Sequence, residues 1–224
     1  MRNERPFDII DVRAGLEEEN ERYAAQVRTW CREHGIFLIN LMGSPGAGKT
    51  TLLCRILDAL KTDYTIGVIE ADVDADVDAQ TVSGHGAKAV QLHTGGSCHM
   101  DARMTLTGLQ ALEAQHPQII VLENVGNLVC PAEFDVGANL KLMILSVPEG
   151  DDKPLKYPLM FTVSECMLIN KIDAASVFDF DPARCEKNVR ALNESMPIFP
   201  VSGRTGEGLE PFLDWLKERI HESH

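Results

Sequence analysis

The apolar residues of this 224-residue chain fall into short continuous runs, separated by longer segments of helical pattern. Continuous rather than alternating runs are typical of strands that are buried on both faces. The pattern therefore predicts an α/β fold, in which a mostly parallel sheet of about seven strands is covered by helices. The predicted strands are IFLINLM (36–42), TIGVIEA (65–71), AVQLH (89–93), IIVLEN (119–124), LKLMILSV (140–147), CMLIN (166–170) and IFPVS (198–202).

The first part of the chain carries one long amphipathic helical pattern. It covers residues 11–34, and Gly35 follows as a typical helix stop. We predict a helical extension over residues 1–35 that docks on one domain over residues 36–224. The apolar positions of this helix are Tyr23, Val27, Trp30 and Cys31.

Composition narrows the possible partners and the cellular location. A net charge of −13 and an isoelectric point near 4.9 repel nucleic acids and anionic membranes, so a phosphate must bind at a local site built from backbone. No apolar run approaches the roughly 20 residues that span a bilayer, and MRNERPFDII lacks the apolar core of a signal peptide. Six cysteines are too few for a disulfide scaffold in a chain of this length. We expect a cytoplasmic protein with reduced thiols and no nucleic-acid or membrane partner.

A phosphate-binding loop follows the first predicted strand. The segment GSPGAGKT, residues 43–50, satisfies G-x-x-x-x-G-K-[ST], and a helical pattern continues from it. Glycines let backbone N–H groups wrap a phosphate, Lys49 reaches the β and γ oxygens, and the Thr50 hydroxyl can bind Mg²⁺. The alternative, a chance glycine-rich turn, does not explain the strand before the loop and the helix after it. The predicted phosphate-binding residues are Gly43, Ser44, Gly46, Ala47, Gly48, Lys49, Thr50 and Thr51.

Guanine is the predicted base. LINKID resembles the N-K-x-D pattern of GTPases, and a carboxylate at Asp173 can accept hydrogen bonds from guanine N1–H and its exocyclic amine. Adenine does not offer these donors, so a GTPase is favoured over an ATP-dependent P-loop kinase, and residues 36–224 are assigned as a GTP-binding domain. The later segment VSGRTGEG fits the loop that contacts the base edge in GTPases. The predicted base-binding residues are Asn170, Lys171, Asp173, Ser202, Gly203 and Arg204.

Acidic residues at strand ends are candidates for the Mg²⁺ site. IIVLENVG places Glu123 and Gly126 in the D-x-x-G slot of GTPases, with Glu replacing Asp. Glu123 would hold Mg²⁺ through water, and the Gly126 amide would sense the γ-phosphate. Within EADVDADVDA, Asp72 lies at a strand end, whereas Asp74 and Asp76 fit a solvated loop better. The predicted Mg²⁺ ligands are Thr50, Asp72 and Glu123.

Two thiols and one imidazole form a candidate transition-metal site. Cys98 and His99 open a predicted helix over residues 98–112, whose dipole would lower a thiol pKa, and Cys130 follows in a separate segment. This set suits Ni²⁺ or Zn²⁺ and leaves a coordination position open. Spacing alone gives equal weight to a buried cysteine with a capping histidine. The remaining candidates are interpreted as packing cysteines and loop histidines: Cys31, Cys54, Cys166, Cys185, His85, His93 and His116.

These motifs together resemble the HypB family of hydrogenase nickel-incorporation GTPases. The resemblance rests on GSPGAGKTTLL, CHMDA, ENVGNLVCPAEFDVG, PEGDDKPLKYP and NKID, in this order, from about residue 15 to the C-terminus. ENVGNLVCPAEFDVG separates the chain from the related urease accessory GTPases. The resemblance implies GTP hydrolysis to GDP and phosphate, a GTP-promoted homodimer with the metal at its interface, and nickel delivery to the large subunit of [NiFe]-hydrogenase. The implied partner is a nickel-binding maturation factor of the HypA type.

The resemblance also assigns roles to residues. It implies that Lys153 lies near the nucleotide, from within the chain or across the dimer. The implied catalytic residues are Lys49, Asp72, Asp78 and Glu123, and the implied metal ligands are Cys98, His99 and Cys130.

The chain departs from some relatives in its metal-binding segments. It lacks the cysteine-rich motif or histidine-rich tract that some carry near the N-terminus, and Arg103 stands where some have a further histidine. A tight separate nickel site is therefore not expected. The alternative function is a GTP-dependent scaffold for a maturation partner with a regulatory or structural zinc site.

Overall fold

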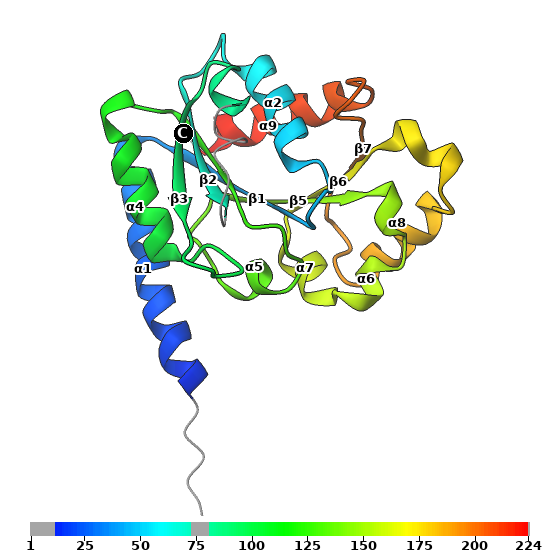
Figure 1. Ribbon diagram of the computed structural model, residues 1–224, viewed down its shortest axis with the longest axis horizontal. Helices are drawn as coiled ribbons and strands as arrows, with labels where there is room; N and C mark the ends of the chain where they lie inside the picture. The colour runs from blue at the N-terminus through cyan, green and yellow to red at the C-terminus, as the bar shows by residue number, and fades with distance from the viewer. Residues whose placement is uncertain (1–11, 73–80, 224) are drawn as a thin grey trace, which may run out of the picture.

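A parallel sheet forms the centre of the computed structural model, which describes residues 12–72 and 81–223. The sheet has seven strands in the order β3-β2-β4-β1-β5-β6-β7, and its paired strands all run parallel (Figure 1). The predicted mostly parallel sheet is therefore confirmed. The strands are β1 (Phe37–Gly43), β2 (Ile66–Asp72), β3 (Lys88–His93), β4 (Ile119–Glu123), β5 (Leu140–Ser146), β6 (Cys166–Asn170) and β7 (Ile198–Pro200).

Helices cover both faces of this sheet, and the alternation of side chains along β1 shows how. Ile39 and Leu41 pack in one apolar cluster with residues of α2 and α9, whereas Leu38 packs on the opposite face with α1 and α4. Met42 joins a third cluster with residues of α7 and α8. The helices are α1 (Val12–His34), α2 (Lys49–Leu60), α4 (Ala102–Leu112), α5 (Cys130–Glu133), α6 (Lys153–Lys156), α7 (Pro158–Val163), α8 (Pro182–Arg190) and α9 (Leu209–Glu222), with the 3₁₀ helices η1 (Glu113–Gln115), η2 (Val147–Glu149) and η3 (Ile172–Val177).

The strand order places a crevice at the carboxyl end of β1. β1 lies between β4 and β5, so the chain leaves the sheet in opposite directions on its two sides. The register pairs Leu41 with Glu123 and Gly43 with Ile144, which aligns the strand ends at one edge. Ligands of open α/β sheets bind at such a switch point. The fold therefore predicts a ligand site where the loops after β1 and β4 meet.

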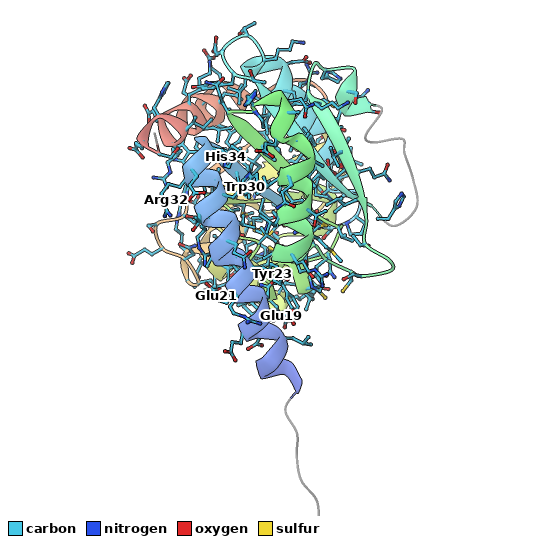
Figure 2. The ribbon with its side chains drawn as sticks, turned by 90° about the vertical axis from the view of Figure 1, so that its left-hand side faces the viewer. Glu19, Glu21, Tyr23, Trp30, Arg32 and His34 are labelled. Carbon is cyan, nitrogen blue, oxygen red and sulfur yellow. The ribbon has the colours of Figure 1, made fainter. Side chains whose placement is uncertain are left out.

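The predicted N-terminal helix is present as α1 and packs beside α4 (Figure 2). Its Val27 and Cys31 are fully buried in the cluster that also contains Leu38 of β1. Trp30 is partly buried and stacks on His34, with 4.3 Å between ring centroids. The helix is thus docked on the sheet as expected, while the division of the chain at residue 35 stays a prediction. Among the described helices, none combines the length and apolarity needed to cross a membrane.

Gly137 sets how closely α1 approaches the loop after α5. Its φ is +76°, and a Cβ added there would lie 2.6 Å from the carbonyl oxygen of Ala24 and 2.8 Å from Cβ of Val27. Only glycine fits this contact without displacing the helix.

We expect Gly137→Ala to lower the free energy of unfolding by about 2–4 kcal/mol, because left-handed strain adds to overpacking against α1. Gly35→Ala is the matched control, since Gly35 has a φ of +63° but open space around its Cβ position. Its expected cost is about 1 kcal/mol from backbone strain alone. Urea denaturation of both variants provides the measurement, and equal losses would contradict the packing argument.

Candidate functional site

The predicted phosphate loop leaves β1 at the crevice and enters α2. Gly46 and Gly48 have φ values of +75° and +94°, a conformation that favours glycine. Gly43 is needed for a different reason, because a Cβ there would lie 2.7 Å from the carbonyl oxygen of Ile144 in β5. Lys49 begins α2, is 9% exposed, and its Nζ lies 3.4 Å from the carbonyl oxygen of Ser44. The loop is therefore folded tightly over the sheet edge with its lysine directed back along it.

Asn170, at the end of β6, braces this loop from the neighbouring strand. Its Nδ2 donates to the carbonyl oxygen of Ala47 at 2.8 Å, and its Oδ1 accepts from the N–H groups of Lys171 and Gly203 at 2.8 and 3.0 Å. A Cβ at Gly48 would lie 2.5 Å from this Nδ2. The structure thus gives Asn170 a positioning role among three loops; its predicted contact with the base stays a prediction.

Lys171 and Asp173 lie in the predicted N-K-x-D segment directly after β6. Lys171 adopts a φ of +65°, and its Nζ donates to the carbonyl oxygen of Gly46 at 2.6 Å. Asp173 is exposed, and its Oδ1 accepts a hydrogen bond from the Ser202 hydroxyl at 2.7 Å. A carboxylate held in this way can present its other oxygen to guanine, as the N-K-x-D reading requires.

The loop of Ser202, Gly203 and Arg204 is anchored by Arg55, a residue that sequence reasoning did not single out. Arg55 projects from α2 and donates from Nε to the carbonyl oxygen of Gly203 at 3.0 Å, and from Nη2 to that of Arg204 at 2.8 Å. The helix that begins at the phosphate loop therefore also positions the predicted base loop.

A cleft of about 670 Å³ opens where these loops meet β4. Thr50 Oγ1 donates to Glu123 Oε1 at 2.9 Å, so a hydroxyl and a carboxylate lie side by side in the cleft. Such oxygens are the ligands that Mg²⁺ prefers, and they would hold it beside the phosphates. The lining residues are Pro45, Gly46, Gly48, Lys49, Thr50, Thr51, Glu70, Ala71, Glu123, Asn124, Val125, Gly126 and Lys171.

Glu70 is a second carboxylate in the cleft, and it was not predicted. It is 3% exposed, and the parallel register of β2 and β4 places it opposite Glu123. The signal was a lone glutamate within the apolar run IGVIEA. Asp72 ends β2, but its side chain lies outside the described residues, as do Asp74, Asp76 and Asp78, so their predicted roles stay predictions.

Gly126 and Lys153 were both predicted to lie near the nucleotide, and the structure gives them different surroundings. A Cβ at Gly126 would lie 2.9 Å from Cα of Pro45, so the segment after β4 rests against the phosphate loop. Lys153 begins α6, and its Nζ lies 5.3 Å from the ring centroid of Tyr157. Lys153 is not among the described residues that line the cleft, and its contact with the nucleotide, from within the chain or across a dimer, stays a prediction.

The structure brings Cys98, His99 and Cys130 together. Their ligand atoms all lie within 4.8 Å of one another, with 2.9 Å between the two Sγ atoms and 3.8 Å from Cys98 Sγ to His99 Nδ1. All six cysteines of the chain are free thiols. His99 also stacks on Phe134, with ring centroids 4.0 Å apart. Two sulfurs and a nitrogen converging in this way fit a thiophilic cation with a remaining open position.

The position of these ligands relative to α4 corrects a prediction. The helix begins at Ala102 rather than at Cys98, because Asp101 caps it by accepting a hydrogen bond from the Met104 N–H at 2.7 Å. Cys98 and His99 therefore lie in the loop before the helix. The pKa of the Cys130 thiol is raised, chiefly by its hydrogen bond with Cys98 and then by burial. The pKa of His99 is lowered by burial, against the opposing effect of nearby Asp101 and Glu133.

The other cysteines and histidines lie away from this cluster. Burial raises the pKa of Cys31 and of Cys185 to about 12, so both stay protonated as packing residues. His93 and His116 are exposed, and His85 bonds to Asp58. The four cysteines predicted to pack are buried: Cys31, Cys54, Cys166 and Cys185.

Comparison with known proteins identifies the family that shares this arrangement. Residues 37–200 match the family model CobW/HypB/UreG, nucleotide-binding domain. The chain is 43% identical over 209 residues to the hydrogenase maturation factor HypB of Rhizobium leguminosarum bv. viciae, covering 93% of this chain and 70% of that protein. The chain belongs to the HypB family. The predicted resemblance is thus confirmed, and the chain is a P-loop GTPase of a family of hydrogenase maturation factors.

Solved HypB structures agree with this assignment. The crystal structure of HypB from Helicobacter pylori in complex with nickel has a TM-score of 0.86 and 36% identity, covering 91% of this chain and 96% of that one. HypB from Archaeoglobus fulgidus has a TM-score of 0.85 and 34% identity, covering 91% and 99%. The signal recognition particle receptor FtsY from Elizabethkingia anophelis, at 14% identity and a TM-score of 0.57 over 96% of this chain and 76% of that one, shares the fold alone.

We expect Lys49→Ala to reduce GTP hydrolysis by about 100-fold or more, because the loop loses the cation that faces the phosphates. Lys61→Ala is the matched control, since Lys61 lies just beyond α2 and pairs with Asp58 outside the cleft. Phosphate release under saturating GTP is the measurement. Unchanged hydrolysis in Lys49→Ala would refute the phosphate-loop assignment.

The variant Asp173→Asn tests whether Asp173 selects guanine. An amide has one acceptor and one donor end, so in either orientation one of the two guanine donors would face the amide NH₂ group. The same amide can pair with the N1–H and the C2 carbonyl of xanthine. We expect GTP affinity to fall about 100-fold and xanthosine triphosphate to bind better than it does to the unmodified protein. The control is Asp179→Asn, an exposed position close by in sequence. A variant that still prefers GTP would contradict the assigned contact.

Proposed function

We propose that this protein is a metal-binding GTPase that assists nickel delivery to [NiFe]-hydrogenase, with GTP hydrolysis linked to dimerisation and to metal binding. The observation that carries the proposal is the convergence of Cys98, His99 and Cys130 beside a segment that lines the nucleotide cleft. Membership of the HypB family and the nickel complex of its H. pylori relative support nickel as the cargo.

The residues of the cleft would act on GTP by positioning and charge. Backbone N–H groups of the phosphate loop and Lys49 would hold the β- and γ-phosphates, and Asp173 would select guanine. Mg²⁺ held near Thr50 and Glu123 would neutralise developing charge on the phosphate oxygens. Asp72 or Asp78 would orient the attacking water. We expect slow turnover, because the motifs provide no arginine finger.

The segment after β4 would link metal affinity to the bound nucleotide. Glu123 and Gly126 line the cleft, and Cys130 is the fourth residue after Gly126. A segment that closes on the γ-phosphate would therefore displace Cys130 and change the geometry of the metal site, and hydrolysis would reverse that change.

Dimerisation would complete the metal site. The described residues of each chain offer three clustered ligand atoms, one fewer than the four of a closed tetrahedral site. A two-fold interface could place two such sets together, sharing one ion or holding two. In the cytoplasm, the dimer would exchange nickel with a HypA-type factor and the hydrogenase large subunit.

Nickel titration of the protein, monitored by thiolate-to-metal absorbance, tests the link to the nucleotide. We expect a different affinity or stoichiometry with GDP than with a non-hydrolysable GTP analogue, and loss of the signal in Cys98→Ala. Cys185→Ala is the matched control, because its thiol has a pKa of about 12 and lies in α8. Binding that ignores the nucleotide would exclude the proposed link.

Hydrogenase maturation in cells separates delivery from a scaffold role. If the cluster delivers nickel, Cys98→Ala should abolish hydrogenase activity while the purified variant keeps its GTPase activity, because Cys98 is not among the described cleft-lining residues. Normal maturation in this variant would favour the alternative, a GTP-dependent scaffold whose zinc site is structural or regulatory.

A further inference from the structure

The loop that carries Cys98 and His99 is held by three asparagine side chains from elsewhere in the fold. Two of them bond to the loop backbone and the third to the backbone of Ala102, where the loop ends and α4 begins, and none of these three bonds involves a ligand atom of Cys98 or His99. The three contacts are Asn127 Nδ2 to the carbonyl oxygen of Cys98 at 3.3 Å, Asn124 Oδ1 from the N–H of Met100 at 3.0 Å, and Asn20 Oδ1 from the N–H of Ala102 at 3.0 Å. The first two contacts flank His99 directly.

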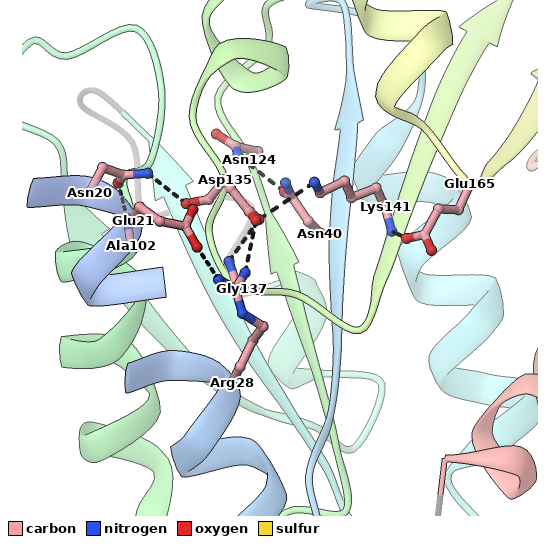
Figure 3. Close-up of polar contacts among 10 residues, drawn as sticks. All are labelled: Asn20, Glu21, Arg28, Asn40, Ala102, Asn124, Asp135, Gly137, Lys141 and Glu165. Carbon is pink, nitrogen blue, oxygen red and sulfur yellow. Dashed lines mark hydrogen bonds and ion pairs between the residues drawn. The ribbon is translucent and has the colours of Figure 1, made fainter. Parts of the chain in front are cut away.

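Asn124 belongs to the nucleotide cleft as well as to the metal loop. It follows Glu123, lines the cleft and is 1% exposed. Its Nδ2 donates to Asn40 Oδ1 at 3.1 Å (Figure 3), and its N–H donates to the carbonyl oxygen of Leu41 at 3.0 Å. A buried amide that loses a hydrogen-bond partner destabilises the protein, because the unpaired polar atom has no water to replace that partner. We therefore expect Asn124 to keep its bond to the metal loop.

Asn127 connects the same loop to the start of the phosphate loop. Its backbone N–H donates to the carbonyl oxygen of Gly43 at 3.1 Å, while its side chain donates to Cys98 and accepts from the Val129 N–H at 2.9 Å. One residue therefore contacts the phosphate-loop strand, the Cys98 backbone and the turn that leads to Cys130.

Asn20 holds the metal loop from a different direction. It projects from α1, and besides Ala102 it bonds through Nδ2 to the carbonyl oxygen of Asp135 at 2.8 Å (Figure 3). Asn20 is not among the described residues that line the nucleotide cleft. It thus holds the end of the loop, where α4 begins, from outside the described cleft.

We propose that Asn124 and Asn127 couple the nucleotide cleft to the Cys98–His99 half of the metal site, as positioning residues that carry the loop backbone with the segment after β4. This inference rests on the proposed link between nucleotide and metal. Cys130 follows that segment through the chain itself, whereas Cys98 and His99 lie about 30 residues away in sequence and need these bonds to move with it. All three ligands then respond together to one displacement.

The test is the coupling ratio, defined as the Ni²⁺ dissociation constant with GDP divided by that with a non-hydrolysable GTP analogue. In Asn127→Ala we expect this ratio to move toward 1 by about three- to tenfold, the equilibrium effect of losing one or two hydrogen bonds. By linkage, the effect of Ni²⁺ on the affinity for each nucleotide should shrink by the same factor. A purely structural role would not change this ratio.

Asn20→Ala is the matched control, because it frees the same loop at Ala102 without touching the segment after β4. We expect it to weaken Ni²⁺ binding equally with both nucleotides, so that its ratio stays at the wild-type value. Asn124→Ser is a second variant, whose shorter side chain cannot span to Met100; circular dichroism checks that it folds.

The outcomes separate this inference from the proposed function. A wild-type ratio different from 1 that survives in Asn127→Ala and in folded Asn124→Ser overturns the inference and leaves the nucleotide link standing. An equal fall of the ratio in Asn20→Ala would also overturn it, because loop rigidity alone would then explain the effect. A wild-type ratio of 1 refutes the nucleotide link itself, and the inference with it.

Discussion

The side-chain amide of Asn170 is the contact on which the nucleotide cleft depends. It bonds to the backbone of the phosphate loop, of its own N-K-x-D loop and of the loop at Gly203, three segments that lie far apart in sequence. Gly48 has to lack a Cβ because this amide comes so close. One buried group therefore links the geometry that would hold the phosphates to the geometry that would read the base, and Arg55 adds a second link between the same loops.

Charge imposes a second constraint on the cleft. Among its described lining residues, Lys49 and Lys171 are opposed by Glu70 and Glu123, within a chain of net charge −13. A triphosphate brings several more negative charges, and two lysines and the loop amides cannot offset the carboxylates as well. A bound nucleotide would therefore favour the proposed divalent cation near Glu123, where the Thr50 hydroxyl lies.

The sequence could predict those parts of the structure that depend on residues next to one another in the chain. Neighbouring residues in the sequence define the phosphate loop, the N-K-x-D segment and the buried strands. The fold and the position of these two loops could therefore be predicted. Glu70, Arg55 and the asparagines around the metal loop could not, because their importance comes from partners brought close by strand register and helix packing. The predicted helix start at Cys98 was wrong because Asp101 accepts a hydrogen bond from the Met104 N–H and so begins α4 at Ala102.

The accessible thiols of the protein are confined to one place on its surface. Four of the six cysteines are buried in the apolar layers between sheet and helices, whereas Cys98 is exposed and Cys130 is partly exposed. Among the six cysteines, a thiophilic ion that meets the folded chain therefore finds accessible thiols at Cys98 and Cys130. Accessibility would therefore decide which thiols a cation can reach, whatever the affinity of each site. The buried cysteines can then pack in the core without competing with Cys98 and Cys130 for a cation.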